Sequence, residues 1–159
     1  GSLLIAFACA KFGQFNYFDG GLAVFTMKLA VTKSTLPFAN AFVLGIMCNM
    51  LVCLAVLASL SAKDTAGKIA GVFFPISFFV ICGFEHCVAN MYYIPAGIFA
   101  ATVPEYAAKA AEAGVNLSAL TWSGFFIGNL IPVTLGNLAG GLAVGILMWL
   151  GHAWEKEKK

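Results

Sequence analysis

A short polar insert interrupts a long apolar stretch of the chain, at Gly83-Phe84-Glu85-His86-Cys87-Val88-Ala89-Asn90-Met91. A carboxylate, an imidazole and an amide lie here inside a segment long enough to cross a membrane. A charge placed centrally in hydrocarbon costs about 2.5 kcal/mol or more, so ionisable groups in such segments usually mark a substrate path or a proton relay. The insert therefore predicts a membrane transport protein.

The composition of the 159 residues fits a membrane setting. Hydrophobic residues make up 61% of the chain and charged residues 10%, against about a quarter charged in a typical soluble domain. The net charge of +2 comes without a basic cluster, which argues against nucleic-acid binding. The five cysteines form no C-x-x-C pair, so neither a disulfide framework nor a zinc site is indicated. We predict no metal and no cofactor.

Apolar runs divide the chain into candidate membrane spans. These are residues 1–12 (partial), 37–60, 69–102 (broken) and 120–150. A straight helix over 69–102 would be about 50 Å long, against a hydrocarbon core of about 30 Å. We therefore expect this stretch to break at Glu85–Asn90, with Pro95 and Gly97 helping to end its second half. Free backbone groups at such a break are tolerated where they line a cavity or are buried in protein.

The last span carries a face of small residues. Gly124, Gly128, Gly136 and Gly140 recur at four-residue steps, and Pro132 occupies the remaining position as a place to kink. Because that face is nearly bare backbone, we expect it to pack closely against another helix.

Three segments together resemble the formate/nitrite transporter family. Residues 84–98 (Phe84-Glu85-His86-Cys87-Val88-Ala89-Asn90-Met91, then Ile94-Pro95-Ala96-Gly97-Ile98) are similar to its fifth helix, 129–137 (Asn129-Leu130-Ile131-Pro132-Val133-Thr134-Leu135-Gly136-Asn137) to its sixth and 45–56 to its fourth. The resemblance covers essentially the whole chain. It implies an all-α membrane protein, an aquaporin-like helical bundle with broken helices, with about three and a half of six spans present and the chain beginning inside the third.

The resemblance also implies a function. Members of such a family are channels or transporters, not enzymes, for small monovalent weak-acid anions such as formate, nitrite or hydrosulfide. An anion loses much of its hydration in an apolar channel and crosses more easily once it has taken a proton. His86 suits that proton exchange because an imidazole ordinarily titrates at about pH 6.5. The alternative for His86 is a hydrogen-bonded core histidine.

Polar residues elsewhere resemble the family's anion pathway. Asn49 and Asn137 are similar to asparagines that donate hydrogen bonds to a passing anion, the alternative being that buried asparagines bridge helices. Asn129 is a further candidate. Lys33 resembles a lysine at the outer mouth that raises the local anion concentration, and a snorkelling interfacial lysine is the alternative.

Apolar residues would close the pathway to bulk water. Phe79 precedes His86 by about two helical turns, so both can line one face before the break. It resembles a constriction phenylalanine, with lipid-facing packing as the alternative. Val52, one turn from Asn49, would join the same gate. Glu85 and Asn90 are predicted to support the broken backbone rather than to contact the anion.

Two other classes of protein stay open. In a haem-bearing membrane subunit His86 would be an axial ligand, and a second buried histidine would have to come from another chain because His152 lies at the membrane edge. In a non-transporting membrane scaffold, the buried polar residues would only specify helix packing.

The lysines give a weak topological signal. One side would carry Lys63, Lys68, Lys156, Lys158 and Lys159, and the other Lys11, Lys28, Lys33 and Lys109. The excess favours a cytoplasmic C terminus under the positive-inside rule. The resemblance implies a multi-pass protein of the inner (plasma) membrane, a homopentamer with the lipid bilayer and small anions as its partners.

Overall fold

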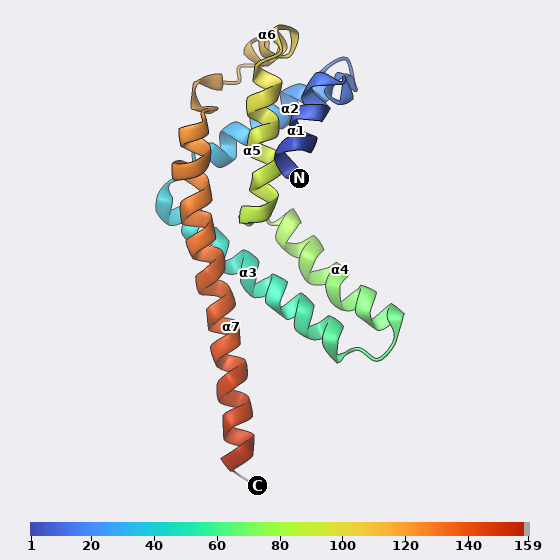
Figure 1. Cartoon of the computed structure of the whole chain (residues 1–159), viewed down its shortest axis with the longest axis vertical. Helices are drawn as coiled ribbons and strands as arrows, with labels where there is room; N and C mark the ends of the chain where they lie inside the picture. The colour runs from blue at the N-terminus through green and yellow to red at the C-terminus, as the bar shows by residue number, and fades with distance from the viewer. Residues whose placement is uncertain (158–159) are drawn as a thin grey trace. The chain divides into compact units, whose positions relative to one another are not determined.

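The computed structural model describes residues 1–157, with side chains described through His152. Lys158 and Lys159, used in the topological count above, lie outside the described residues. All regular structure in the described part is helical (Figure 1), which confirms the all-α prediction. The helices form two units, one of residues 1–40 and 87–132, the other of residues 41–86 and the chain from Val133 onward.

Seven α-helices and three short helical turns make up the described part of the chain. The α-helices are α1 (Ser2–Lys11), α2 (Gly21–Ser34), α3 (Phe38–Ser61), α4 (Thr65–Ile81), α5 (Cys87–Ala101), α6 (Pro104–Glu112) and α7 (Ile131–Glu157). The short turns are η1 (Gln14–Asn16), η2 (Leu117–Ala119) and the π-helical η3 (Gly124–Leu130).

Among residues 1–157, two helical segments are long and apolar enough to cross a membrane by themselves. These are α3, with a mean hydropathy of 2.5, and the continuous segment Gly124–His152, with a mean hydropathy of 1.8. The apolar helices α4 and α5 have 17 and 15 residues, against about 20 for a full span. Each is therefore of the length expected for part of a broken span.

The break between α4 and α5 begins earlier than the polar residues suggest. Gly83 has φ of +69°, the left-handed conformation with which helices commonly end. Residues 84–86 are non-helical, and α5 starts at Cys87. The prediction of a break extending over Glu85–Asn90 was thus wrong at its far end, because residues 87–90 form the first turn of α5. The polar residues mark the break, but a glycine ends α4.

Pro95 and Gly97 do not end the second half, contrary to expectation. Both are buried inside α5, which continues to Ala101. A proline removes one backbone donor, which packed neighbours can compensate in a membrane helix. Gly97 has a packing role instead, since a Cβ there would collide with the side chain of Ala30 on α2.

The first unit is built around α5. Helices α1 and α2 both lie against it, and α6 covers the end that α5 reaches at Ala101 (Figure 1). Small residues dominate the shared core and let the backbones come close, as is usual between membrane helices. The core consists of Ala6, Ala10, Phe15, Ala23, Met27, Ala96, Ala100, Tyr106 and Ala110.

The second unit contains the close helix pair predicted from the glycine face. A Cβ at Gly136 would overlap the carbonyl of Phe42 on α3, and one at Gly140 would overlap that of Ile46. From the opposite side, a Cβ at Gly45 would lie 2.9 Å from the carbonyl oxygen of Val133. Gly136 and Gly140, two members of the predicted series, thus confirm close packing, and α3 is the helix against which α7 packs.

The expected irregularity at Pro132 takes the form of a wide helical turn. The segment η3 ends just before this proline, and the N–H of Ile131 bonds to the carbonyl of Phe126, five residues back. Proline has no N–H to continue the ordinary ladder. Wide π-turns of this kind often occur at functional sites.

Candidate functional site

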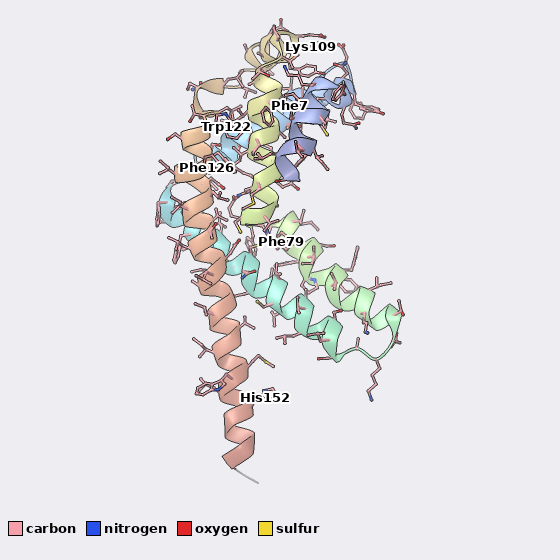
Figure 2. All side chains as sticks on the ribbon, viewed as in Figure 1. Phe7, Phe79, Lys109, Trp122, Phe126 and His152 are labelled. Carbon is pink, nitrogen blue, oxygen red and sulfur yellow. The ribbon has the colours of Figure 1, made fainter. Side chains whose placement is uncertain are left out.

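The aromatic rings of Phe79 and His86 are stacked in the second unit. Their centroids lie 5.8 Å apart and their planes differ by 25°. Phe79, in the last turn of α4 (Figure 2), is 9% exposed, and His86 is half-buried. The phenyl ring therefore covers one face of the imidazole and limits its orientation. The contact brings the two residues together at the break, and that they line a pathway stays a prediction.

Asn137 ties three segments of the second unit together. Its Nδ2 donates one hydrogen bond to the carbonyl of Gly45 on α3 and another to the carbonyl of Glu85 in the break, both at 2.9 Å. A side-chain amide has two donor hydrogens, so both are engaged. Asn137 is 6% exposed. Of the two roles considered for it, these contacts favour helix bridging over donation to an anion.

Asn49 is placed differently from Asn137. Its Nδ2 donates to the carbonyl of Asn137 at 2.5 Å, and within residues 1–157 its second amide hydrogen has no hydrogen-bond acceptor. Asn49 also lines an open cavity of about 350 Å³, together with Leu138, Gly141, Leu142, Gly145, Ile146 and Trp149 of α7. An amide at the wall of such a cavity is of the type that can donate to a small anion. Val52 is half-buried one turn further along α3 but does not line this cavity.

The two predicted supporting residues belong to different units. The Glu85 side chain is 2% exposed, and its main-chain carbonyl accepts the bond from Asn137. Asn90 is fully buried in the first turn of α5, where its Nδ2 donates to Oδ1 of Asn129 at 2.7 Å. The backbone of the break is thus held through Glu85, and Asn90 belongs to a second amide network.

Lys33 lies in the first unit, in the last turn of α2. Its Nζ is 5.9 Å from the ring centroid of Tyr93 on α5, a cation–π geometry. Its carbonyl accepts a hydrogen bond from Nδ2 of Asn129 at 2.9 Å. The sequence analysis did not single out Tyr93, and it gave Asn129 as a further candidate without a role. Pro37, four residues after Lys33, was the available signal that this carbonyl needs another donor.

The haem interpretation requires a second buried histidine. His152 is the other histidine of the chain, and it lies exposed towards the end of α7 (Figure 2). A ring nitrogen of His152 is 3.0 Å from the carbonyl of Met148, one turn back on the same helix. This chain therefore supplies no second buried histidine beside His86.

An ion pair outside the candidate spans anchors the loop between α1 and α2. Lys109 on α6 donates to the carbonyl of Asp19 at 2.7 Å and to its carboxylate at 2.9 Å. The hydrogen bond to Asp19 raises the pKa of Lys109. Phe18 and Asp19 both have left-handed backbones, with φ of 58° and 54°. The ion pair between Lys109 and Asp19 therefore stabilises a loop conformation that non-glycine residues rarely adopt.

Known proteins match this chain over most of its length. The family model described as "Formate/nitrite transporter" matches residues 1–150. The "Probable formate transporter" of Methanothermobacter thermautotrophicus is 48% identical over 136 residues, which cover 85% of this chain and 43% of that protein. "Formate channel FocA" of Escherichia coli (strain K12) is 37% identical over 162 residues, which cover 99% of this chain and 56% of that protein.

A solved structure gives the same assignment. The "Pentameric formate channel with formate bound" aligns with a TM-score of 0.83 at 37% identity, covering 96% of this chain and 61% of that one. The chain spans about half the length of the curated relatives it matches. Those relatives are named as channels and transporters rather than as enzymes. On the match over residues 1–150 and this structural similarity, the chain belongs to the formate/nitrite transporter family of membrane proteins.

Proposed function

We propose that the full-length protein is a membrane channel for small monovalent weak-acid anions, with formate as the principal permeant and His86 as the proton-exchanging group. Relatives named as formate channels and a structural neighbour described with formate bound support the choice of anion. Nitrite and hydrosulfide are the alternative permeants.

The stacked pair of Phe79 and His86 carries the proposal. An imidazole at the end of a helix break, with one face covered by a phenyl ring, is a titratable group in an otherwise apolar segment. A half-buried imidazole retains an open side through which it can exchange a proton with a small acid. Protonation of the anion there would produce the neutral acid, which crosses an apolar barrier at lower cost.

Two further residues serve the anion before it reaches His86. Lys33 contributes positive charge near an entrance, which raises the local concentration of anions. Asn49 offers an amide hydrogen to the partly dehydrated anion. Val52 keeps the adjoining wall apolar. Asn137 and Glu85 hold the backbone beside His86, and Asn90 orders the start of α5.

The proposed assembly is a homopentamer in the inner (plasma) membrane. The pentameric structural neighbour supports the number of protomers. The lysine distribution supports a cytoplasmic C terminus.

Uptake of formate, nitrite and hydrosulfide into liposomes containing the full-length protein, measured from about pH 5 to pH 8, tests the proposal because an unperturbed imidazole titrates within that range. His86→Asn should abolish the pH dependence of uptake while the pentamer persists on size-exclusion chromatography. His152→Asn is the matched control and should leave uptake unchanged. Unchanged flux with His86→Asn would refute the proton-exchange role. If this variant altered assembly of the pentamer but not flux, the result would favour the scaffold interpretation. A haem absorbance band in the purified protein would favour the subunit interpretation.

A further inference from the structure

We infer that Asn129 is a positioning residue for Lys33: its side-chain amide fixes the end of α2 against α5 and so determines where the Lys33 ammonium lies. The inference rests on the proposed function in one respect, namely that Lys33 attracts the permeant anion. The contacts of Asn129 themselves lie entirely within the first unit.

The Asn129 amide connects two helices from a fully buried position. Its Nδ2 donates to the Lys33 carbonyl at 2.9 Å, and its Oδ1 accepts from Nδ2 of Asn90 at 2.7 Å. Asn90 and Asn129 are both 0% exposed. The bond between Asn90 and Asn129 is buried and the bond to the Lys33 carbonyl is partly buried, so water competes little for them, and loss of the amide would remove both.

The Lys33 carbonyl requires a donor from outside its own helix. In a continuing α-helix this carbonyl would accept the N–H of residue 37. Residue 37 is Pro37, which has no N–H, and α2 ends at Ser34. The last carbonyls of a helix are satisfied by side chains, water or ligands. Asn129 supplies the donor that Pro37 lacks.

The wide turn η3 brings Asn129 to this place. It brings the backbone of Gly128 close to α2, where a Cβ on Gly128 would lie 3.6 Å from the carbonyl of Ser34. The irregularity follows from Pro132, which cannot continue the ordinary hydrogen-bond ladder. The two prolines thus have complementary effects. Pro37 cannot donate to the Lys33 carbonyl, and Pro132 follows the widened turn η3, which carries the Asn129 amide that does donate to it.

The same face of α5 also fixes the charged end of Lys33. Tyr93, whose ring lies 5.9 Å from Nζ, follows Asn90 by three residues. Residues three apart on a helix are neighbours on its surface. Lys33 is therefore held at its main chain, through Asn129 and Asn90, while its ammonium lies over the ring of Tyr93. Release of the main-chain contact should let the ammonium move away from its present position.

Two measurements on the full-length protein test the inference. The first is the rate at which Lys33 is acetylated by acetic anhydride, read by peptide mass spectrometry relative to the exposed Lys63. Asn129→Leu should raise this ratio severalfold. Asn116→Leu makes the same chemical change at an exposed site and should leave the ratio unchanged. An unchanged ratio in Asn129→Leu would overturn the inference whatever the transport result.

The second measurement is the half-saturation concentration for formate uptake. Asn129→Leu should raise it severalfold, as Lys33→Met does, with the maximal rate retained. The double variant should be no worse than Lys33→Met alone, since the two residues act as one unit. Additive effects would contradict positioning through Lys33. If Lys33→Met does not change half-saturation, the pathway role of Lys33 in the proposed function fails, and the acetylation ratio alone decides the inference.

Both measurements require that the Asn129→Leu variant still assembles, and size-exclusion chromatography tests this. If it does not, Asn129→Ser gives the same test. Its hydroxyl can satisfy Asn90 or a water molecule but is too short to span the distance to the Lys33 carbonyl. The acetylation ratio should again rise, and a value equal to that of the unmodified protein would overturn the inference.

Discussion

The amide of Asn137 holds the carbonyl of Glu85, the residue immediately before His86, at a distance of 2.9 Å. A residue on α7 thereby restrains the non-helical backbone that carries the imidazole. The same amide also bonds to Gly45 on α3, so the position of His86 depends on how α3 and α7 pack.

Replacement of Asn137 by leucine should strongly destabilise the protein. It removes the two hydrogen bonds by which the buried Asn137 amide joins the carbonyls of Gly45 and Glu85, each worth about 0.5–1.5 kcal/mol. Asn49→Leu is the matched variant and should cost less, because the half-buried Asn49 amide makes one such bond and the buried Asn137 amide makes two. Thermal unfolding in detergent measures both. An equal or smaller loss for Asn137→Leu would contradict the bridging role.

Two alanine substitutions on α7 should have opposite effects. Gly140→Ala places a methyl group against the carbonyl of Ile46, so it should separate α3 from α7 and lower the midpoint of thermal unfolding. A Cβ at Gly145 would have no atom within 4 Å. Gly145→Ala should therefore be neutral or stabilising by up to about 1 kcal/mol, the usual gain of alanine over glycine in a helix. Similar losses in both variants would refute close packing at Gly140.

Phe79→Ala should reduce selectivity rather than abolish transport. It uncovers one face of the His86 imidazole and removes bulk from the proposed constriction, so formate uptake should persist while chloride conductance rises. Phe78→Ala is the control, because Phe78 is 54% exposed and contacts Phe84 rather than His86. Conductance measurements in planar bilayers compare the two. A rise in chloride conductance with the control variant alone would argue against the gate.

The contact between Lys109 and Asp19 predicts a pH effect on stability. Because the hydrogen bond raises the pKa of Lys109 above 10.5, its contribution is present at pH values below 10.5 and is lost as the pH rises through the higher folded-state pKa. Asp19→Asn should therefore lower the unfolding midpoint slightly at neutral pH, and the difference should vanish in strongly alkaline buffer. The pair is exposed, so the effect is small. A difference that grows with alkalinity would contradict this assignment.

The sequence was sufficient to predict that a helix break exists and that two helices pack closely, because each depends on local physical constraints. An apolar run too long for one span, interrupted by Glu85, His86 and Asn90, has to break. The spacing of Phe79 and His86 predicts that both can line one face, and their role in a pathway stays a prediction. The glycine series likewise predicted a close helix pair, and Gly136 and Gly140 form it with α3.

Other features depend on contacts between distant parts of the chain. The donors of Asn137 are engaged by carbonyls 92 and 52 residues away, which no local pattern indicates. Gly97 resembles a helix terminator in sequence, but its role is to admit Ala30 of α2. The bond from Asn129 to Lys33 joins residues 96 apart. The sequence shows Pro37 near one end of this bond and Pro132 near the other. Only the fold shows that Asn129, beside Pro132, supplies the donor that Pro37 lacks.

The shortness of α4 and α5 has a consequence for biosynthesis. With 17 and 15 residues, neither offers the cellular insertion machinery a full hydrophobic segment of about 20 residues. We therefore expect α4 and α5 to enter the bilayer together. The hydrophobic free energy gained by both helices then offsets the cost of burying the polar residues between them. Substitutions that make either piece more polar, however far from His86, would then lower the yield of inserted protein before any effect on transport arises.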